Sequence, residues 1–171
     1  GTFTGTGTTR TFTPTAAWAP PGEVKVKVVQ TVGGVPSDAS DLVTLKVKPP
    51  KPAITLVPQP IEGRQVLTIT GVAAGTVTLT MLTDAGGTVV GIFTGSGTSR
   101  TFTPTSAWTP PGEKRVKVVQ TVGGVSSDAS DLVTLKVKPP KPAITLVPQP
   151  IEGRQVLTIT GGAAAAVTLT M

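Results

Sequence analysis

Side chains that could carry out chemistry are scarce in this chain. It has no cysteine and no histidine, which excludes disulfides, metal sites built on those ligands, and Ser-His or Cys-His catalysis. It also has no asparagine, so N-linked glycosylation is excluded. Catalysis would then need a pair of carboxylates or a Ser-Lys arrangement, and the sequence contains no recognisable motif for either. We therefore expect no enzymatic activity, no cofactor and no bound metal.

Positive charge is the most prominent remaining feature, with a net charge of +6 at pH 7. Basic residues fall on two consecutive predicted strands and on their counterparts 90 residues later. If these strands pair, the side chains form a stripe on the solvent face, which we call the basic stripe: Lys25, Lys27, Lys46, Lys48, Arg115, Lys117, Lys136 and Lys138. It could meet an anionic polysaccharide, a phospholipid surface or a nucleic acid. We favour a simpler interpretation, a solubilising face that also protects edge strands from pairing. Nucleic acid is disfavoured, because interleaved aromatic residues and a recognition helix are missing.

The two tryptophans, Trp18 and Trp108, are the next candidates. An exposed indole could stack on a sugar ring. The alternative, which we favour, is a plug in or at the end of the core beside Phe12 and Phe102, because a tryptophan buries a large apolar area.

Two acidic turns are candidates for calcium binding. Asp38-Ala39-Ser40-Asp41 recurs at 128–131, and each copy places two carboxylates three residues apart beside serine hydroxyls. Calcium prefers six to eight oxygen ligands, and the lysines near the adjoining linker would repel a cation. We therefore favour a cap on a solvated turn.

An internal repeat organises the whole chain. Residues 1–81 align without gaps to residues 91–171, and 70 of the 81 pairs are identical. The resulting period of 90 residues exceeds that of solenoid repeats and favours a small domain repeated in tandem.

Proline-rich segments mark the boundaries between the predicted domains. Lys48-Pro49-Pro50-Lys51-Pro52 recurs 90 residues later and favours stiff polyproline II rather than a strand. We therefore expect the C-terminal part of one domain at 1–50, a complete domain at 51–140, and the N-terminal part of the next at 141–171. Because the chain does not begin with methionine, we expect it to be an internal or processed piece of a longer protein.

The complete domain contains closely spaced strand patterns. Apolar residues alternate with threonine or lysine, which is typical of half-buried strands, and Asp84-Ala85-Gly86-Gly87 is typical of a hairpin turn. The predicted strands are 53–57, 66–70, 76–81, 89–93, 100–103, 115–122 and 132–137. About seven short strands with frequent turns and no helical periodicity predict an all-β, antiparallel β-sandwich.

The order of these motifs resembles bacterial Ig-like domains. The resemblance rests on Pro52-Ala53-Ile54-Thr55, Ile69-Thr70-Gly71, Thr76-Val77-Thr78-Leu79, Thr101-Phe102-Thr103-Pro104, Trp108, Pro111-Gly112, Val116-Lys117-Val118-Val119-Gln120-Thr121, Ser126-Ser127 and Ser130. It spans the whole 90-residue unit and implies tandem Ig-like sandwiches of the kind found in surface adhesins and biofilm-associated proteins. It implies no catalytic residue.

These observations together predict an extracellular structural spacer on a bacterial surface. Its partners would be neighbouring Ig-like repeats in the same chain or other copies. Two alternatives remain open, namely a fibre subunit completed head to tail between copies, and a module that binds glycan or a surface through the basic stripe. No apolar run approaches the ~20 residues of a membrane helix, so we expect no membrane span.

Overall fold

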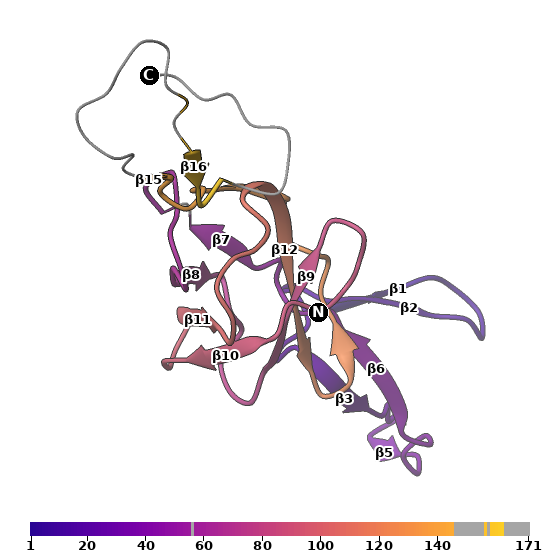
Figure 1. Ribbon diagram of the computed structural model, residues 1–171. Coiled ribbons are helices and arrows are strands. Elements are labelled where there is room, and N and C mark those ends of the chain that lie inside the picture. The colour runs from indigo at the N-terminus through magenta and orange to yellow at the C-terminus, as the bar shows by residue number, and fades with distance from the viewer. Residues whose placement is uncertain (56, 146–155, 157, 163–171) are drawn as a thin grey trace.

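The chain folds into β-strands and turns. The computed structural model describes residues 1–55, 57–145, 156 and 158–162, and every regular element in this part is a strand (Figure 1). The all-β class predicted from the alternating Thr and Val pattern is therefore confirmed. Within the described residues, no helix is long and apolar enough to cross a membrane.

One antiparallel sheet has the strand order β10-β11-β8-β7. Its strands are β7 (Ala53–Thr55), β8 (Leu67–Thr70), β10 (Gly91–Thr94) and β11 (Arg100–Pro104). The register places Ile54 opposite Ile69 and Phe102 opposite Leu67. Because alternate residues of a strand face the same side, these apolar side chains form one buried face of the sheet.

The second antiparallel sheet is centred on a long strand, β12 (Gly112–Val122). β9 (Thr78–Thr83) pairs with one stretch of it, and β14 (Val133–Val137) and the short β13 (Val125–Ser126) pair with others. Met81 lies opposite Val118.

A single hydrophobic core joins the two sheets. Its buried residues are Ile54, Ile61, Leu67, Ile69, Val72, Met81, Phe102, Trp108, Val116, Val118, Leu135 and Val137. They come from β7, β8 and β11 on one side, from β9, β12 and β14 on the other, and from the intervening loops. All of them lie between residues 51 and 140.

Each predicted strand between 51 and 140 is present, with its ends shifted by a few residues. The predicted turn at Asp84–Gly87 forms and closes a short hairpin. The Thr83 N–H donates to Gly87 O at 2.7 Å and the Val89 N–H donates to Met81 O at 2.8 Å, with an antiparallel bridge between Leu82 and Thr88. The pairing ends there, and the chain crosses to the other sheet as β10.

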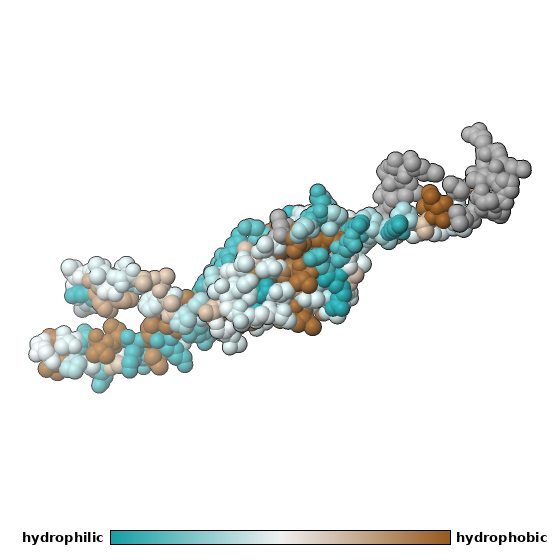
Figure 2. All heavy atoms as spheres, turned by 90° about the vertical axis from the view of Figure 1, so that its left-hand side faces the viewer, coloured by the Kyte–Doolittle hydropathy of each residue, from teal (hydrophilic) through white to brown (hydrophobic). Residues whose placement is uncertain are grey.

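The same strand pairs recur at both ends of the chain. The end strands are β1 (Thr2–Thr4), β2 (Thr11–Thr13), β3 (Gly22–Val26), β4 (Thr31–Val32), β5 (Val35–Pro36), β6 (Val43–Val47), β15 (Ala143–Thr145) and β16 (Thr158–Thr160). Their registers copy those of the central unit: Gly22 faces Val47 as Gly112 faces Val137. The molecule is elongated (Figure 2), and the strands β3 and β6 lie on the side of the central body opposite β15 and β16 (Figure 1).

Candidate functional site

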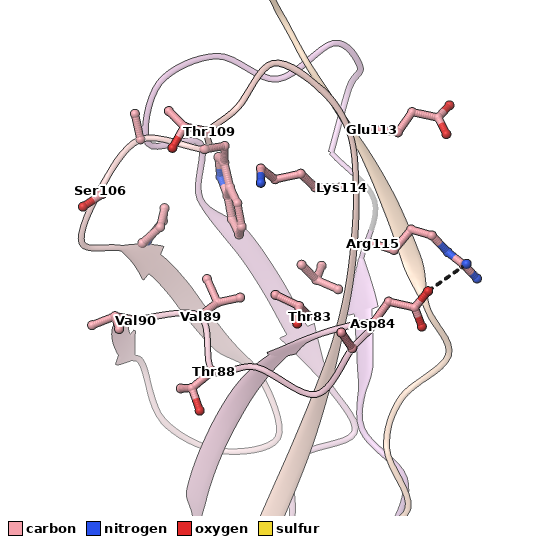
Figure 3. Close-up of a pocket in the computed structure, with 15 residues that line it drawn as sticks. Thr83, Asp84, Thr88, Val89, Val90, Ser106, Thr109, Glu113, Lys114 and Arg115 are labelled. Atoms are coloured by element: carbon pink, nitrogen blue, oxygen red, sulfur yellow. Dashed lines mark ion pairs between the residues drawn. The ribbon is translucent and has the colours of Figure 1, made fainter. Parts of the chain in front are cut away.

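A depression of about 620 Å³ lies beside the turn at Asp84 and the loop before β12. The lining strand alternates: Lys114 points into the depression, whereas Glu113 and Arg115 point away from it (Figure 3). Arg115 is held by Asp84 at 2.8 Å. One lysine beside threonine and valine side chains gives the depression little capacity for chemistry.

The two tryptophans have different environments. Trp108 also lines this depression but is only 6% exposed. Its indole N–H donates to the carbonyl of Gln65 at 2.9 Å, and its ring packs beside Phe102 with centroids 6.3 Å apart. A sugar cannot stack on a ring face that is already covered. Trp18 is 41% exposed and lies beside Phe12 in the N-terminal segment.

The basic stripe divides between two strand pairs. Lys25 lies on β3 and Lys46 on the facing β6, with Lys27 and Lys48 just beyond the strand ends. Of their counterparts, Arg115 and Lys117 lie within β12 and Lys136 lies on the facing β14, with Lys138 just beyond its end. The structure therefore places the predicted residues near one another within each pair of strands.

Acidic groups accompany much of this positive charge. Lys48 pairs with Asp128 at 2.6 Å, Arg115 with Asp84, and Lys138 with Glu62 at 2.5 Å. Lys136 faces Glu113 across the β12–β14 pair, and Glu23 faces Lys46 in the same way. These contacts reduce the charge that the stripe could offer to an anionic ligand.

Two serines, one within the acidic turn at 128–131 and one just before it, replace missing sheet hydrogen bonds. Ser127 and Ser130 are buried, and their hydroxyls accept from the backbone N–H groups of Gln120 and Val118 at 3.2 and 2.9 Å. The chain there leaves the β12 edge without a regular ladder, and the hydroxyls satisfy donors that would otherwise be buried unpaired. In the described residues, no group of three or more acidic side chains is placed to hold a metal ion.

The proline linker is bound to the central unit by a buried glutamine. Gln120 has no exposed surface. Its Nε2 donates to the carbonyl of Pro50 at 2.6 Å and to that of Gly71 at 3.0 Å, and its Oε1 accepts from the Ala73 N–H at 2.8 Å. One side chain therefore fixes the linker to the end of the core.

Two ion pairs and one backbone contact complete this joint. Lys48 and Lys51, on either side of the prolines, reach Asp128 and Asp131 at 2.6 Å each. Gly22, at the start of β3, lies against Val122: a Cβ placed on it would come within 3.3 Å of the Val122 carbonyl oxygen. Gly22 has φ +105°, a conformation that favours glycine. The N-terminal segment thus contacts the central unit both through the linker and directly.

The N-terminal segment also contains an exposed apolar groove. This groove, of about 420 Å³, is lined by Phe3, Phe12, Trp18, Val26, Val28 and Val43, together with Lys27 and Ser40. Phe3 is 58% exposed and Val28 52%. The counterparts of Phe12, Trp18 and Val28 in the central unit are Phe102, Trp108 and Val118, which are buried.

The buried position of Gln120 could have been predicted from the sequence, although the sequence analysis did not single it out. Gln120 follows Val116 and Val118 at the same two-residue spacing, so it occupies an inward-facing position of an otherwise apolar strand face. A polar residue at such a position must find partners inside the protein. The ion pairs from Lys48 and Lys51 join residues 80 positions apart and have no comparable local signal.

Comparison with known proteins does not identify the chain. No protein-family model matches it, and no curated protein matches it significantly.

Proposed function

We propose that the chain belongs to an extracellular stalk, a spacer built from tandem Ig-like domains whose joints are stiff. The placement outside the cell and on a bacterial surface rests on the sequence resemblance described above. The Ig-like assignment has further support in the order of the strands. Constant-type Ig sandwiches have one sheet in the order A-B-E-D and another in the order C-F-G. Here β7, β8, β11 and β10 correspond to A, B, E and D, and β9, β12 and β14 correspond to C, F and G.

The observation that supports a stalk most strongly is the hydrogen bond from Gln120 to Pro50 at 2.6 Å. A spacer keeps the part that it carries at a fixed distance only if its joints resist bending. Prolines restrict the linker backbone, and Gln120 adds a buried anchor that fixes where the linker leaves the unit. Without such anchors, neighbouring domains move relative to each other by default.

Every joint in a longer array would have the same design. The residues of this joint recur 90 positions away, where Lys138, Pro140 and Gly112 match Lys48, Pro50 and Gly22. Gln30 likewise matches Gln120, and the acidic turn at 38–41 matches the one at 128–131. If every joint had the same geometry, each unit would take the same orientation relative to the unit before it. The array would then form an extended rod.

The basic stripe supports glycan binding less well. Three of its eight charged groups are in ion pairs, namely Lys48, Arg115 and Lys138. Such exposed pairs contribute little to stability, but they lower the field that would attract an anionic chain. The stripe is better explained as part of the solvated surface of the rod.

A tandem of two copies of residues 51–140 tests the proposal. The fusion of Pro140 to Lys51 recreates the native linker sequence, because residues 138–142 repeat 48–52. Since the chain has no cysteine, Ser96→Cys in each copy introduces the only two spin labels. We expect pulsed electron spin resonance to give one narrow distribution of distances between the labels.

The same tandem offers a matched control. Gln120→Leu in the second copy removes the anchor for the linker and should broaden the distance distribution. Gln120→Leu in the first copy, which no linker precedes, should leave the distribution narrow although it disturbs the same core. A broad distribution in the parent tandem, or equal broadening by the two substitutions, would refute a stiff joint.

A further inference from the structure

The depression beside Asp84 has a lysine at an inward-facing position of β12. Val116, Val118 and Gln120 are buried at alternate positions of this strand, and Lys114 continues their two-residue spacing. Lys114 is half-buried, and its side chain points into the depression (Figure 3). Lysine is rarely found on the inner face of a strand unless its charge has a partner. The side chain of Gln120, on the same face, has three hydrogen-bond partners, and a partner for Lys114 must lie in the depression.

No acidic side chain of the described residues pairs with Lys114. Asp84 binds Arg115 at 2.8 Å, and both Glu113 and Arg115 point away from the depression (Figure 3). In the part of the chain that the structure describes, none of the ion pairs includes Lys114. The Lys114 ammonium therefore faces an open depression as a single positive charge, and no carboxylate of the described residues neutralises it.

The two copies of the repeat differ most at this depression. Nine of the residues that line it, at 104, 106–109 and 113–116, have counterparts in the N-terminal segment. Four of these nine pairs differ, whereas only seven of the other 72 aligned pairs do. The four differing pairs are Ala16 and Ser106, Ala19 and Thr109, Val24 and Lys114, and Lys25 and Arg115. The depression is therefore a place where one repeat departs from the other.

Three of the four differences exchange an apolar side chain for one that donates hydrogen bonds. Alanine or valine in the N-terminal copy corresponds to Ser106, Thr109 and Lys114 in the central unit, so the central unit has two hydroxyls and an ammonium that the other copy lacks. Drift without selection gives no reason for such exchanges to gather in one depression. The pattern instead favours a binding site whose ligand the two copies do not share.

We infer that the depression of the central unit binds a small organic anion, a carboxylate on a compact body with an apolar face. The Lys114 ammonium would donate to the carboxylate, which is a strong, charge-assisted hydrogen bond. Val89 and Val90 line the depression, and Val90 is 69% exposed, so an apolar face of the ligand would cover them. The volume of about 620 Å³ lies within the range of roughly 300–1,000 Å³ typical of small-molecule sites.

A small monoanion fits this site better than other ligands. A nucleic acid strand needs several cations along its backbone, whereas Lys114 is the one cation of the described residues that points into the depression. A metal ion would be repelled by the ammonium. An uncharged sugar would lack an aromatic face for stacking, because the ring of Trp108 is covered. Charge and apolar contact must therefore provide the affinity.

The two tryptophans allow a direct test by nuclear magnetic resonance of the full chain. Trp108 lines the depression and Trp18 does not, so the two indole N–H signals report on different places, and Trp18→Phe assigns them. Benzoate is the probe, and benzamide, of similar shape but without charge, is its control. We expect benzoate to shift the Trp108 signal saturably and to leave the Trp18 signal in place. Benzamide should bind at least about tenfold more weakly.

A second pair of probes identifies the body that carries the carboxylate. Glucuronate and glucose differ in one carboxylate, as benzoate and benzamide differ in charge. If glucuronate binds more tightly than benzoate, the ligand is an acidic sugar, and the opposite order indicates an organic acid with an apolar body. Both orders support the inference, because both require the anion. If neither anion shifts the Trp108 signal saturably, or if each neutral probe binds as well as its anion, the inference is wrong.

Substitutions of single lysines assign the binding to Lys114. Lys114→Val introduces the residue that the other copy has and should weaken binding of the anion about tenfold or more, whereas Lys114→Arg keeps the charge and should retain binding within about threefold. Lys117→Val is the matched control, because it removes the same charge from the outer face of the same strand, and it should leave binding unchanged. Equal losses from Lys114→Val and Lys117→Val would overturn the inference.

This inference goes beyond the proposed stalk and can fail separately from it. Lys114 lies near the start of β12, whereas Gln120, which holds the linker, lies near its end. In the two-unit tandem, Lys114→Val should therefore leave the distance distribution between the labels narrow. A rod whose units carry different residues at this depression would present different ligand sites along its length.

Discussion

Replacing Gln120 by leucine tests whether the buried amide is essential to the central unit. The substitution leaves the Ala73 N–H without its acceptor, and Ala73 is only 5% exposed. A buried donor left unpaired costs about 1–3 kcal/mol. The two bonds donated to Pro50 and Gly71 are also lost, each worth about 0.5–1.5 kcal/mol, although both residues are exposed, so water can replace part of that loss. We therefore expect the free energy of unfolding to fall by about 2–4 kcal/mol.

Gln30→Leu is the matched control for this prediction. Gln30 occupies the same place in the repeat, and its backbone N–H donates to the Ser37 hydroxyl as that of Gln120 donates to the Ser127 hydroxyl. Its side chain, however, is exposed, so the substitution leaves no buried group unpaired and should change stability by less than about 0.5 kcal/mol.

Urea unfolding of the full chain, followed by tryptophan fluorescence, measures both variants. With a denaturant slope of about 1–3 kcal/mol per molar urea, Gln120→Leu should lower the midpoint by roughly 1 M or more without changing the slope. Equal midpoints for the two variants would refute the view that Gln120 is a structural anchor and Gln30 is not.

Two other predictions use the same repeat as an internal control. Phe102→Ala should destabilise the central unit by about 3–5 kcal/mol, because Phe102 is fully buried, whereas Phe12→Ala should leave its urea midpoint unchanged, because Phe12 is 40% exposed and lies outside that core. Changing Asp128 and Asp131 together to Asn should cost less than about 1 kcal/mol, because both ion pairs are exposed. In the two-unit tandem the same double change in the second copy should broaden the distance distribution between the labels, and an unchanged width would show that these ion pairs do not steer the joint.

The strands of the central unit could be predicted from the sequence because their signal is local. Thr78-Leu79-Thr80-Met81 alternates strictly, and half-buried strands require that alternation. How far the pairing continues after the turn at Asp84 could not be predicted, because a turn with Gly86 and Gly87 fits a long hairpin as well as a short one. Whether the chain stays in the same sheet or crosses to the other depends on which sheet buries the apolar residues that follow, and that is a property of the whole core.

The joint could be predicted only in part. The prolines at 49, 50 and 52 led us to expect a domain boundary and a stiff linker there. The partners of the linker could not be foreseen, because Gln120 lies 70 residues beyond Pro50 and contacts at that separation have no periodic signature. The acidic turn at 128–131 shows the limit of motif reading most clearly. We weighed a calcium site there and favoured a cap on a solvated turn, but Ser127 and Ser130 are buried and accept hydrogen bonds from the edge of β12. Asp128 and Asp131 form ion pairs with the linker lysines.

Small-angle X-ray scattering from arrays of two, three and four copies of residues 51–140 tests the central claim most directly. If each joint is fixed as in this structure, the radius of gyration should increase nearly in proportion to the number of units, and the scattering should follow that of a rod. Flexible joints would instead make the size grow roughly as the square root of the number of units, and that result would contradict a stiff spacer.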